Sequence, residues 1–118
     1  MEILSIILQI ILGIGFLMFG FMKFGSKQMV DEFQRYGYPG SFRIFTGVVE
    51  VVSALLVISG IWNNNLAVYG GILIVVTMLG AIITHIKVKD SVKGMIMPII
   101  LLVLGLIVLF INISFFLA

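Results

Sequence analysis

Four long apolar segments, residues 3–22, 42–62, 66–85 and 95–116, occupy most of this chain, and the first carries no charged residue. At a rise of about 1.5 Å per residue, each helix would cross a hydrocarbon core roughly 30 Å thick. Hydrophobic residues make up 62% of the 118 positions and charged residues 10%, so polar surface is too scarce to cover a soluble domain. We therefore predict an all-α fold, a polytopic transmembrane four-helix bundle forming a single membrane domain over residues 1–118.

Basic residues lie in or beside two of the three connections between these segments. The termini and the Asn-rich second connection carry none, which by the positive-inside rule places both termini outside and connections one and three in the cytoplasm. We expect a multi-pass protein of a bacterial-type plasma membrane. No basic groove with interleaved aromatic residues is present, so nucleic acid is not an expected partner. The basic residues are Lys23, Lys27, Arg35, Arg43, Lys87, Lys89 and Lys93.

The N-terminal segment is expected to be a membrane span rather than a cleaved signal. It has Glu2 where a signal sequence carries a basic residue, and it is longer than a signal's apolar region.

The first connection has the pattern of a short amphipathic helix. Met29, Val30, Phe33 and Tyr36 follow helical spacing, with charged residues at the positions between them. We expect this helix to lie on the cytoplasmic interface and to end at the turn formed by residues 37–40. A connector that packs its apolar face on the bundle and a lid over a binding site both fit the pattern.

Glu50 is the one acid inside an apolar segment. It lies eight residues past Phe42, about 12 Å below the cytoplasmic edge at helical rise, and Thr77 of the third segment lies at a similar depth. Lys23, Arg43 and His85 lie nearer the edge. An ionisable group at such depth is costly, so it indicates either a functional site or a buried ion-pair network that fixes helix register.

The candidate site residues follow from these depths. We expect Glu50 and His85 to be the catalytic residues, with Glu50 accepting or donating a proton and Lys23 or His85 hydrogen-bonding the ligand's oxygen. His85 also fits an interfacial position at the end of its span. The expected ligand-binding set is Lys23, Arg43, Glu50, Thr77, Thr84 and His85. A metal site is not expected, because His85 is the single histidine and the chain contains no cysteine.

Each apolar segment also carries a stripe of small and polar residues, such as Ser5, Gln9, Gly13 and Gly20 in the first. Such stripes mark close contact between membrane helices more often than pockets. We expect them to face the centre of the bundle.

Short motifs along the chain resemble those of the DoxX/DoxD-like family of small four-span membrane proteins. The resemblance implies a four-helix transmembrane bundle and points to Lys23, Glu50 and His85. It also implies a link with quinones, since family members include membrane subunits of a thiosulfate:quinone oxidoreductase and proteins of quinone or catechol stress. The motifs are Gly20-x-x-Lys23-Phe24, Phe33-x-x-x-Gly37-Tyr38-Pro39, Glu50 followed by Gly60, and His85.

The resulting expectation is a protein that binds a small lipophilic quinone or phenolic compound and acts as the quinone-facing or anchoring subunit of a membrane oxidoreductase. The expected partners are the lipid bilayer, this ligand and a redox protein that supplies electrons; homo-oligomerisation and catalysis by the chain itself stay open. The alternative is a non-enzymatic module, either a carrier of small amphiphiles or a scaffold or chaperone for a partner membrane protein. An elongated cavity ending at Glu50 would favour the binder, and a tight Glu50–Lys23 contact without a cavity would favour the scaffold.

Overall fold

The computed structural model describes the backbone of residues 2–117 and the side chains of residues 3–114, and the regular structure of this part is helical throughout. Met1 and Ala118, the ends of the expected domain, lie outside the described residues. Four helices are long and apolar enough to cross a membrane, and a short one lies between the first two. This confirms the predicted all-α fold. The helices are α1 (Glu2–Gly25), α2 (Lys27–Tyr36), α3 (Gly40–Ser59), α4 (Asn64–Lys87) and α5 (Val92–Leu117).

The second span ends earlier than the apolar pattern of the sequence predicts. We expected it to run to Trp62, but α3 ends at Ser59 and the backbone turns through residues 60–62. Trp62 lies in this turn with 80% of its surface exposed. Hydropathy extended the segment because Ile61 and Trp62 are apolar, whereas the chain needs these residues to reverse direction before α4.

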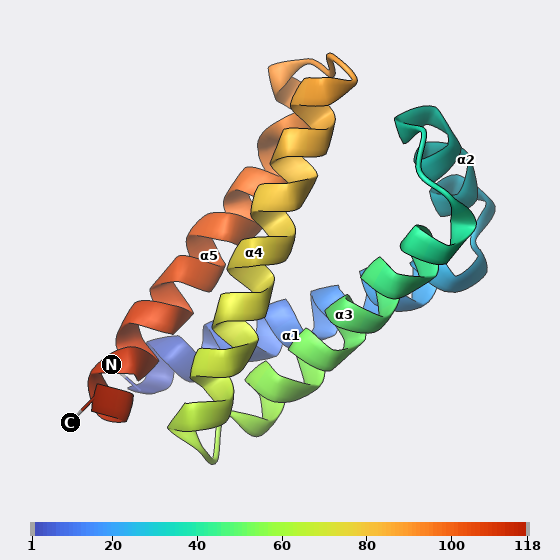
Figure 1. The fold of residues 1–118 in the computed structure, drawn as a ribbon. Helices are drawn as coiled ribbons and strands as arrows, with labels where there is room; N and C mark the ends of the chain where they lie inside the picture. Colours follow the sequence, from blue (N-terminus) through green and yellow to red (C-terminus); the bar gives the residue numbers. More distant parts are fainter. Residues whose placement is uncertain (1, 118) are drawn as a thin grey trace.

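The long helices form two antiparallel pairs. Figure 1 shows α1 lying beside α3 and α4 beside α5. The pairs meet near the end of the molecule that holds both termini and the α3–α4 turn, and they diverge toward the end that holds α2. The V shape leaves space between the pairs on the α2 side.

Small residues on the predicted stripes allow the close helix contacts. A Cβ atom added at Gly20 would lie 2.9 Å from the carbonyl oxygen of Gly47, and one at Gly70 would lie 2.9 Å from the amide nitrogen of Val57. These distances leave no room for a side chain, so glycine sets the approach of α1 to α3 and of α3 to α4. The core between the pairs includes Leu12, Phe16, Val57, Ile74 and Val108, all fully buried.

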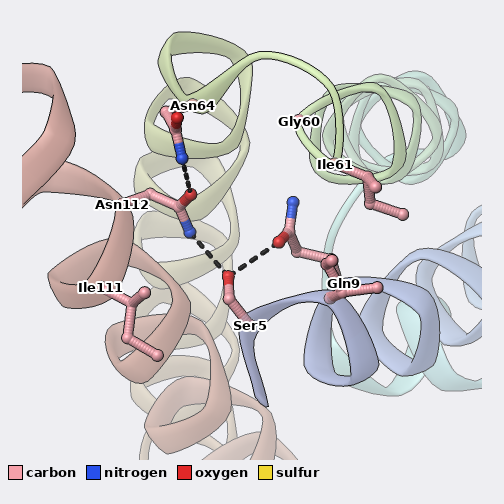
Figure 2. A pocket seen from close by; sticks show the side chains of 8 residues that line it. Ser5, Gln9, Gly60, Ile61, Asn64, Ile111 and Asn112 are labelled. Atoms are coloured by element: carbon pink, nitrogen blue, oxygen red, sulfur yellow. Dashed lines mark hydrogen bonds between the residues drawn. The ribbon is translucent and has the colours of Figure 1, made fainter. Parts of the chain in front are cut away.

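A hydrogen-bonded network joins the two pairs at the end that holds the termini (Figure 2). The Ser5 hydroxyl donates to Gln9 Oε1 at 2.7 Å and accepts from Asn112 Nδ2 at 2.9 Å, while Asn64 Nδ2 donates to Asn112 Oδ1 at 2.7 Å. Gln9 Nε2 donates to the carbonyl of Val57. Because lipid offers no hydrogen bonds, these polar side chains hold α1, α3, α4 and α5 in register.

The first connection folds as the predicted amphipathic helix. Ser26 caps α2 by accepting a hydrogen bond from the amide of Met29, and Phe33 turns inward with 7% of its surface exposed. Gly37 ends the helix at φ 83°, a left-handed conformation that glycine adopts without strain.

Candidate functional site

A cavity of about 1010 Å³ occupies the space between the diverging helix pairs. All five helices contribute to its wall, and α2 borders it at the open end of the V. Aromatic side chains form much of the apolar lining, among them Phe19, Phe33, Phe42 and Phe45. The cavity therefore combines apolar walls with the polar groups described below.

Lys23 and Glu50 form an ion pair in this wall. Lys23 Nζ donates to Glu50 Oε1 at 2.9 Å, and the two side chains are only 14% and 4% exposed. Lys23 belongs to the last turn of α1, and its long side chain reaches the carboxylate of α3 one turn below Gly47. The sequence placed Lys23 nearer the membrane edge, and the structure brings it into direct contact with Glu50.

Arg43 takes a different position from the rest of the predicted set. Its guanidinium donates to the backbone carbonyl of Lys23, and its side chain does not line the cavity. This contact satisfies a carbonyl at the end of α1, where a helix has no internal donor. Arg43 therefore ties α3 to the end of α1 beside the ion pair.

The two predicted threonines of α4 line the cavity. The hydroxyls of Thr84 and Tyr38 lie 2.9 Å apart, a hydrogen bond that crosses from α4 to the loop before α3. Thr77 lies about two turns deeper on α4. Its hydroxyl forms no hydrogen bond with any described residue and belongs to the cavity wall.

His85 contacts Asp90 rather than Glu50. Its Nδ1 atom lies 2.5 Å from Asp90 Oδ2, and the edge of its ring meets Tyr36 of α2. Asp90 in turn accepts from both terminal nitrogens of Arg35, at 2.8 and 3.1 Å. These contacts join α2 to the turn between α4 and α5 across the mouth of the cavity.

Neighbouring side chains at the mouth of the cavity stabilise the ionised forms of the two acids there. The hydrogen bond from Arg35, followed by that from His85, lowers the pKa of Asp90 to about 2. Arg35 also lowers the pKa of Glu32, chiefly through a hydrogen bond. Burial is the main cause that raises the pKa of Tyr36 to about 12, with a further contribution from its hydrogen bond to Glu32. Both acids are therefore ionised at neutral pH, and Tyr36 is neutral.

Five of the six predicted ligand-binding residues line one cavity, and Arg43 does not. The sequence reasoning missed Arg35, Tyr38 and Asp90. Asp90 carried a usable signal, since it follows His85 by five residues beyond the end of an apolar segment. Tyr38 belongs to the motif Phe33-x-x-x-Gly37-Tyr38-Pro39, which did not indicate a role in the site. Arg35 gave no signal, because only the folded chain brings it beside the turn that follows α4.

Comparisons with known proteins identify the family. The model of the DoxX-like family matches residues 7–108. The protein named "Uncharacterized protein YdgD" from Bacillus subtilis (strain 168) is 32% identical over 108 residues, which cover 90% of this chain and 95% of the relative. A second Bacillus subtilis (strain 168) protein, named "Putative oxidoreductase CatD", is 32% identical over 94 residues, covering 79% of this chain and 66% of the relative.

No solved structure matches the chain. Four apolar helices together with these relatives make it a multi-pass membrane protein. The chain belongs to the DoxX-like family of membrane proteins.

Proposed function

We propose that this protein binds a small lipophilic quinone or phenolic compound in the cavity between its two helix pairs. In this proposal it acts as the quinone-facing or anchoring subunit of a membrane oxidoreductase system in a bacterial-type plasma membrane. A partner protein supplies the electrons.

The cavity is the observation that carries the proposal. Its volume of about 1010 Å³ lies at the upper end of the range for ligand pockets, about 300–1,000 Å³. Aromatic side chains offer surfaces against which a planar ring can stack, as Phe42 already does with Phe45 at 6.2 Å between ring centroids. A lipophilic ring compound fits such walls better than a polar metabolite does.

The polar groups of the wall suit the oxygens of such a ligand. A quinone presents carbonyl oxygens that accept hydrogen bonds, and a phenol presents hydroxyls that also donate. Lys23 can donate to a ligand oxygen while remaining near Glu50, and Thr77 offers a hydroxyl that forms no hydrogen bond with any described residue. Glu50 would take up or release a proton as the ligand changes its own protonation.

The name of one relative supports the proposed function in general terms. CatD is named a putative oxidoreductase, which agrees with a role beside an electron-transferring partner. The resemblance to quinone-linked family members points in the same direction.

A non-enzymatic carrier of small amphiphiles is the second candidate. The same cavity favours it over a scaffold, since a protein that only stabilises a partner has no need of an open cavity with polar groups in its apolar wall. A carrier would bind ligands regardless of their redox state, whereas an oxidoreductase subunit should distinguish a quinone from its reduced form.

Thermal unfolding in detergent with and without menaquinone, ubiquinone or a simple catechol tests the proposal. A ligand that binds only the folded state stabilises it by about 2.7 kcal/mol at a hundredfold excess over Kd. We expect Glu50→Gln and His85→Ala to reduce the ligand-induced shift more than they reduce the melting temperature itself. If all three compounds leave the melting temperature of the parent unchanged at saturation, the quinone proposal is wrong.

Mass spectrometry of lipids extracted from the purified protein then identifies the natural ligand.

A further inference from the structure

We propose that Asp90 is a positioning residue for His85, fixing the imidazole with its proton on Nδ1 so that Nε2 exchanges protons with the ligand in the cavity. The ligand part of this inference rests on the proposed function. The part that concerns the imidazole is independent of any ligand.

The geometry at the cavity mouth defines the chain of contacts. His85 Nδ1 lies 2.5 Å from Asp90 Oδ2. Arg35 holds the same carboxylate from the opposite side, with Nη1 2.8 Å from Oδ1 and Nη2 3.1 Å from Oδ2. A carboxylate held by two parallel donors has a fixed plane, so it also fixes the direction of its contact with the imidazole.

The identity of the donor follows from the charge of Asp90. An ionised carboxylate only accepts hydrogen bonds, so the proton between the two groups belongs to Nδ1. In the neutral imidazole this leaves the lone pair on Nε2, and protonation of the ring then adds the second proton there. Nε2 is therefore the atom of His85 that gains or loses a proton.

Nε2 is free to meet a ligand. The His85 side chain is 17% exposed and belongs to the cavity wall, and within the described part of the chain no hydrogen bond to Nε2 occurs. Asp90 has its two oxygens occupied by Arg35 and His85, so it has little capacity left to bind a ligand itself.

The other charged and titratable groups at the mouth do not replace this contact. From α2, Glu32 bonds to Arg35 and to the Tyr36 hydroxyl, and Tyr36 meets the imidazole only through its ring. From α4, the ammonium group of Lys87 lies 4.6 Å from the centre of the Tyr38 ring. Asp90 thus supplies the one carboxylate that contacts His85 among the described residues.

The arrangement supports proton exchange with either form of the proposed ligand. A phenolic O–H can pass its proton to Nε2, which leaves a phenolate and an imidazolium. In the reverse direction the imidazolium N–H donates to a ligand oxygen and returns to the neutral ring. No electron moves in this step, so it needs neither an oxidant nor a reductant.

Because Arg35 belongs to α2, docking of this helix contributes to the orientation of His85. Displacement of α2 would open the mouth and remove Arg35 from Asp90 together.

A nuclear magnetic resonance experiment tests the inference directly. His85 is the chain's one histidine, so ¹⁵N-histidine labelling gives a single pair of ring signals. In spectra where the two ring signals show a neutral imidazole, we expect the parent protein to show protonated Nδ1 and unprotonated Nε2. A proton on Nε2 in the neutral parent overturns the proposal without any variant.

Three variants separate positioning from a general effect on the fold. We expect Asp90→Ala to lose the Nδ1–H form and Asp90→Glu to restore it at least in part. Asp31→Ala is the matched control, since Asp31 is an acid at the same end of the molecule whose partner is Lys27 on the surface of α2. An unchanged tautomer in Asp90→Ala, or the same change in Asp31→Ala, contradicts the assignment.

Binding of 4-tert-butylcatechol extends the test to the ligand. Loss of one well-placed hydrogen bond corresponds to about tenfold weaker binding, which we expect in Asp90→Ala and not in Asp31→Ala. Equal affinity of the parent and Asp90→Ala contradicts the proposed role. Failure of the parent to bind any quinone or catechol overturns the proposed function instead, and the tautomer measurement distinguishes the two cases.

Discussion

Lys23 Nζ lies 2.9 Å from Glu50 Oε1, so the last turn of α1 is joined to the middle of α3 by a largely buried ion pair. The contact depends on the approach of Gly20 to Gly47, which brings the two backbones together one turn away. It also forms part of the cavity wall. One pair of side chains thus contributes to both helix register and the candidate site.

Replacing Lys23 should lower the free energy of unfolding more than replacing Glu50 does. Lys23→Met leaves a desolvated carboxylate without its cation, and breaking a buried pair in this way costs about 3 to 5 kcal/mol. Glu50→Gln should cost less, because the amide keeps a hydrogen-bonding oxygen for Lys23. Arg43→Met should fall between them, since it removes a hydrogen bond to the Lys23 carbonyl and no charge from Glu50.

Thermal or chemical unfolding in detergent at neutral pH measures this order. Lys27→Met is the control, because the Lys27–Asp31 pair is exposed and contributes little. Equal stability of Lys23→Met and Lys27→Met would show that the ion pair is solvated.

A side chain placed in the cavity should block ligand binding without weakening the fold. Gly80 lies in the cavity wall, and a Cβ atom there would meet nothing within 4 Å. We expect Gly80→Leu to unfold at the same temperature as the parent or above it, because glycine inside a helix costs about 1 kcal/mol. The shift induced by a quinone or catechol should shrink.

Gly15→Leu provides the matched comparison. Gly15 is also a helical glycine with open space at its Cβ position, but it does not line the cavity. Its ligand-induced shift should equal that of the parent. A similar loss in both variants would place the ligand elsewhere.

Acid should release α2 from the α4–α5 turn. The pKa of Asp90 is lowered from 3.8 to about 2, so its contacts with Arg35 and His85 stabilise the folded state at pH values above about 4. This contribution is lost as the pH falls through about 2, where the folded protein also protonates the carboxyl. We expect the parent to unfold at a higher temperature than Asp90→Asn at about pH 6, with the difference gone by about pH 2.

Melting curves recorded between about pH 6 and about pH 2 check the direction in which this difference changes with pH. Asp31→Asn, which removes an exposed acid from α2, should follow the parent at each pH. A difference between parent and Asp90→Asn that stays constant down to pH 2 would contradict the role of the ionised carboxylate.

Both ends of the chain should face away from the cytoplasm, because all seven basic side chains belong to or flank the first and third connections. A reporter that works only in the cytoplasm should be inactive when fused to Ala118. The same reporter fused after Lys89, in the third connection, should be active. Activity at Ala118 would reverse the topology and place Glu50 in the outer half of the membrane.

The sequence alone determined the architecture and much of the inward-facing surface. Hydrophobic length predicts helices wherever lipid is the solvent, because backbone groups in hydrocarbon must bond within their own segment. Helical spacing identified Ser5, Gln9 and Gly20 as inward-facing, and the cluster of turn residues at 37–40 identified Gly37 as part of the turn after α2. Glu50 was identifiable because a lone acid in an apolar segment needs a partner.

Only the tertiary structure decided which groups meet. The diverging helix pairs create the cavity, and their angle depends on contacts such as Gly70 with Val57 that no single segment encodes. The same divergence sends His85 to Asp90 and Arg35 rather than to Glu50. Helical periodicity fixes the face and depth of a residue along its own helix. Which residue of another helix it contacts depends on how whole helices pack. The contacts of His85 therefore became known only from the folded structure.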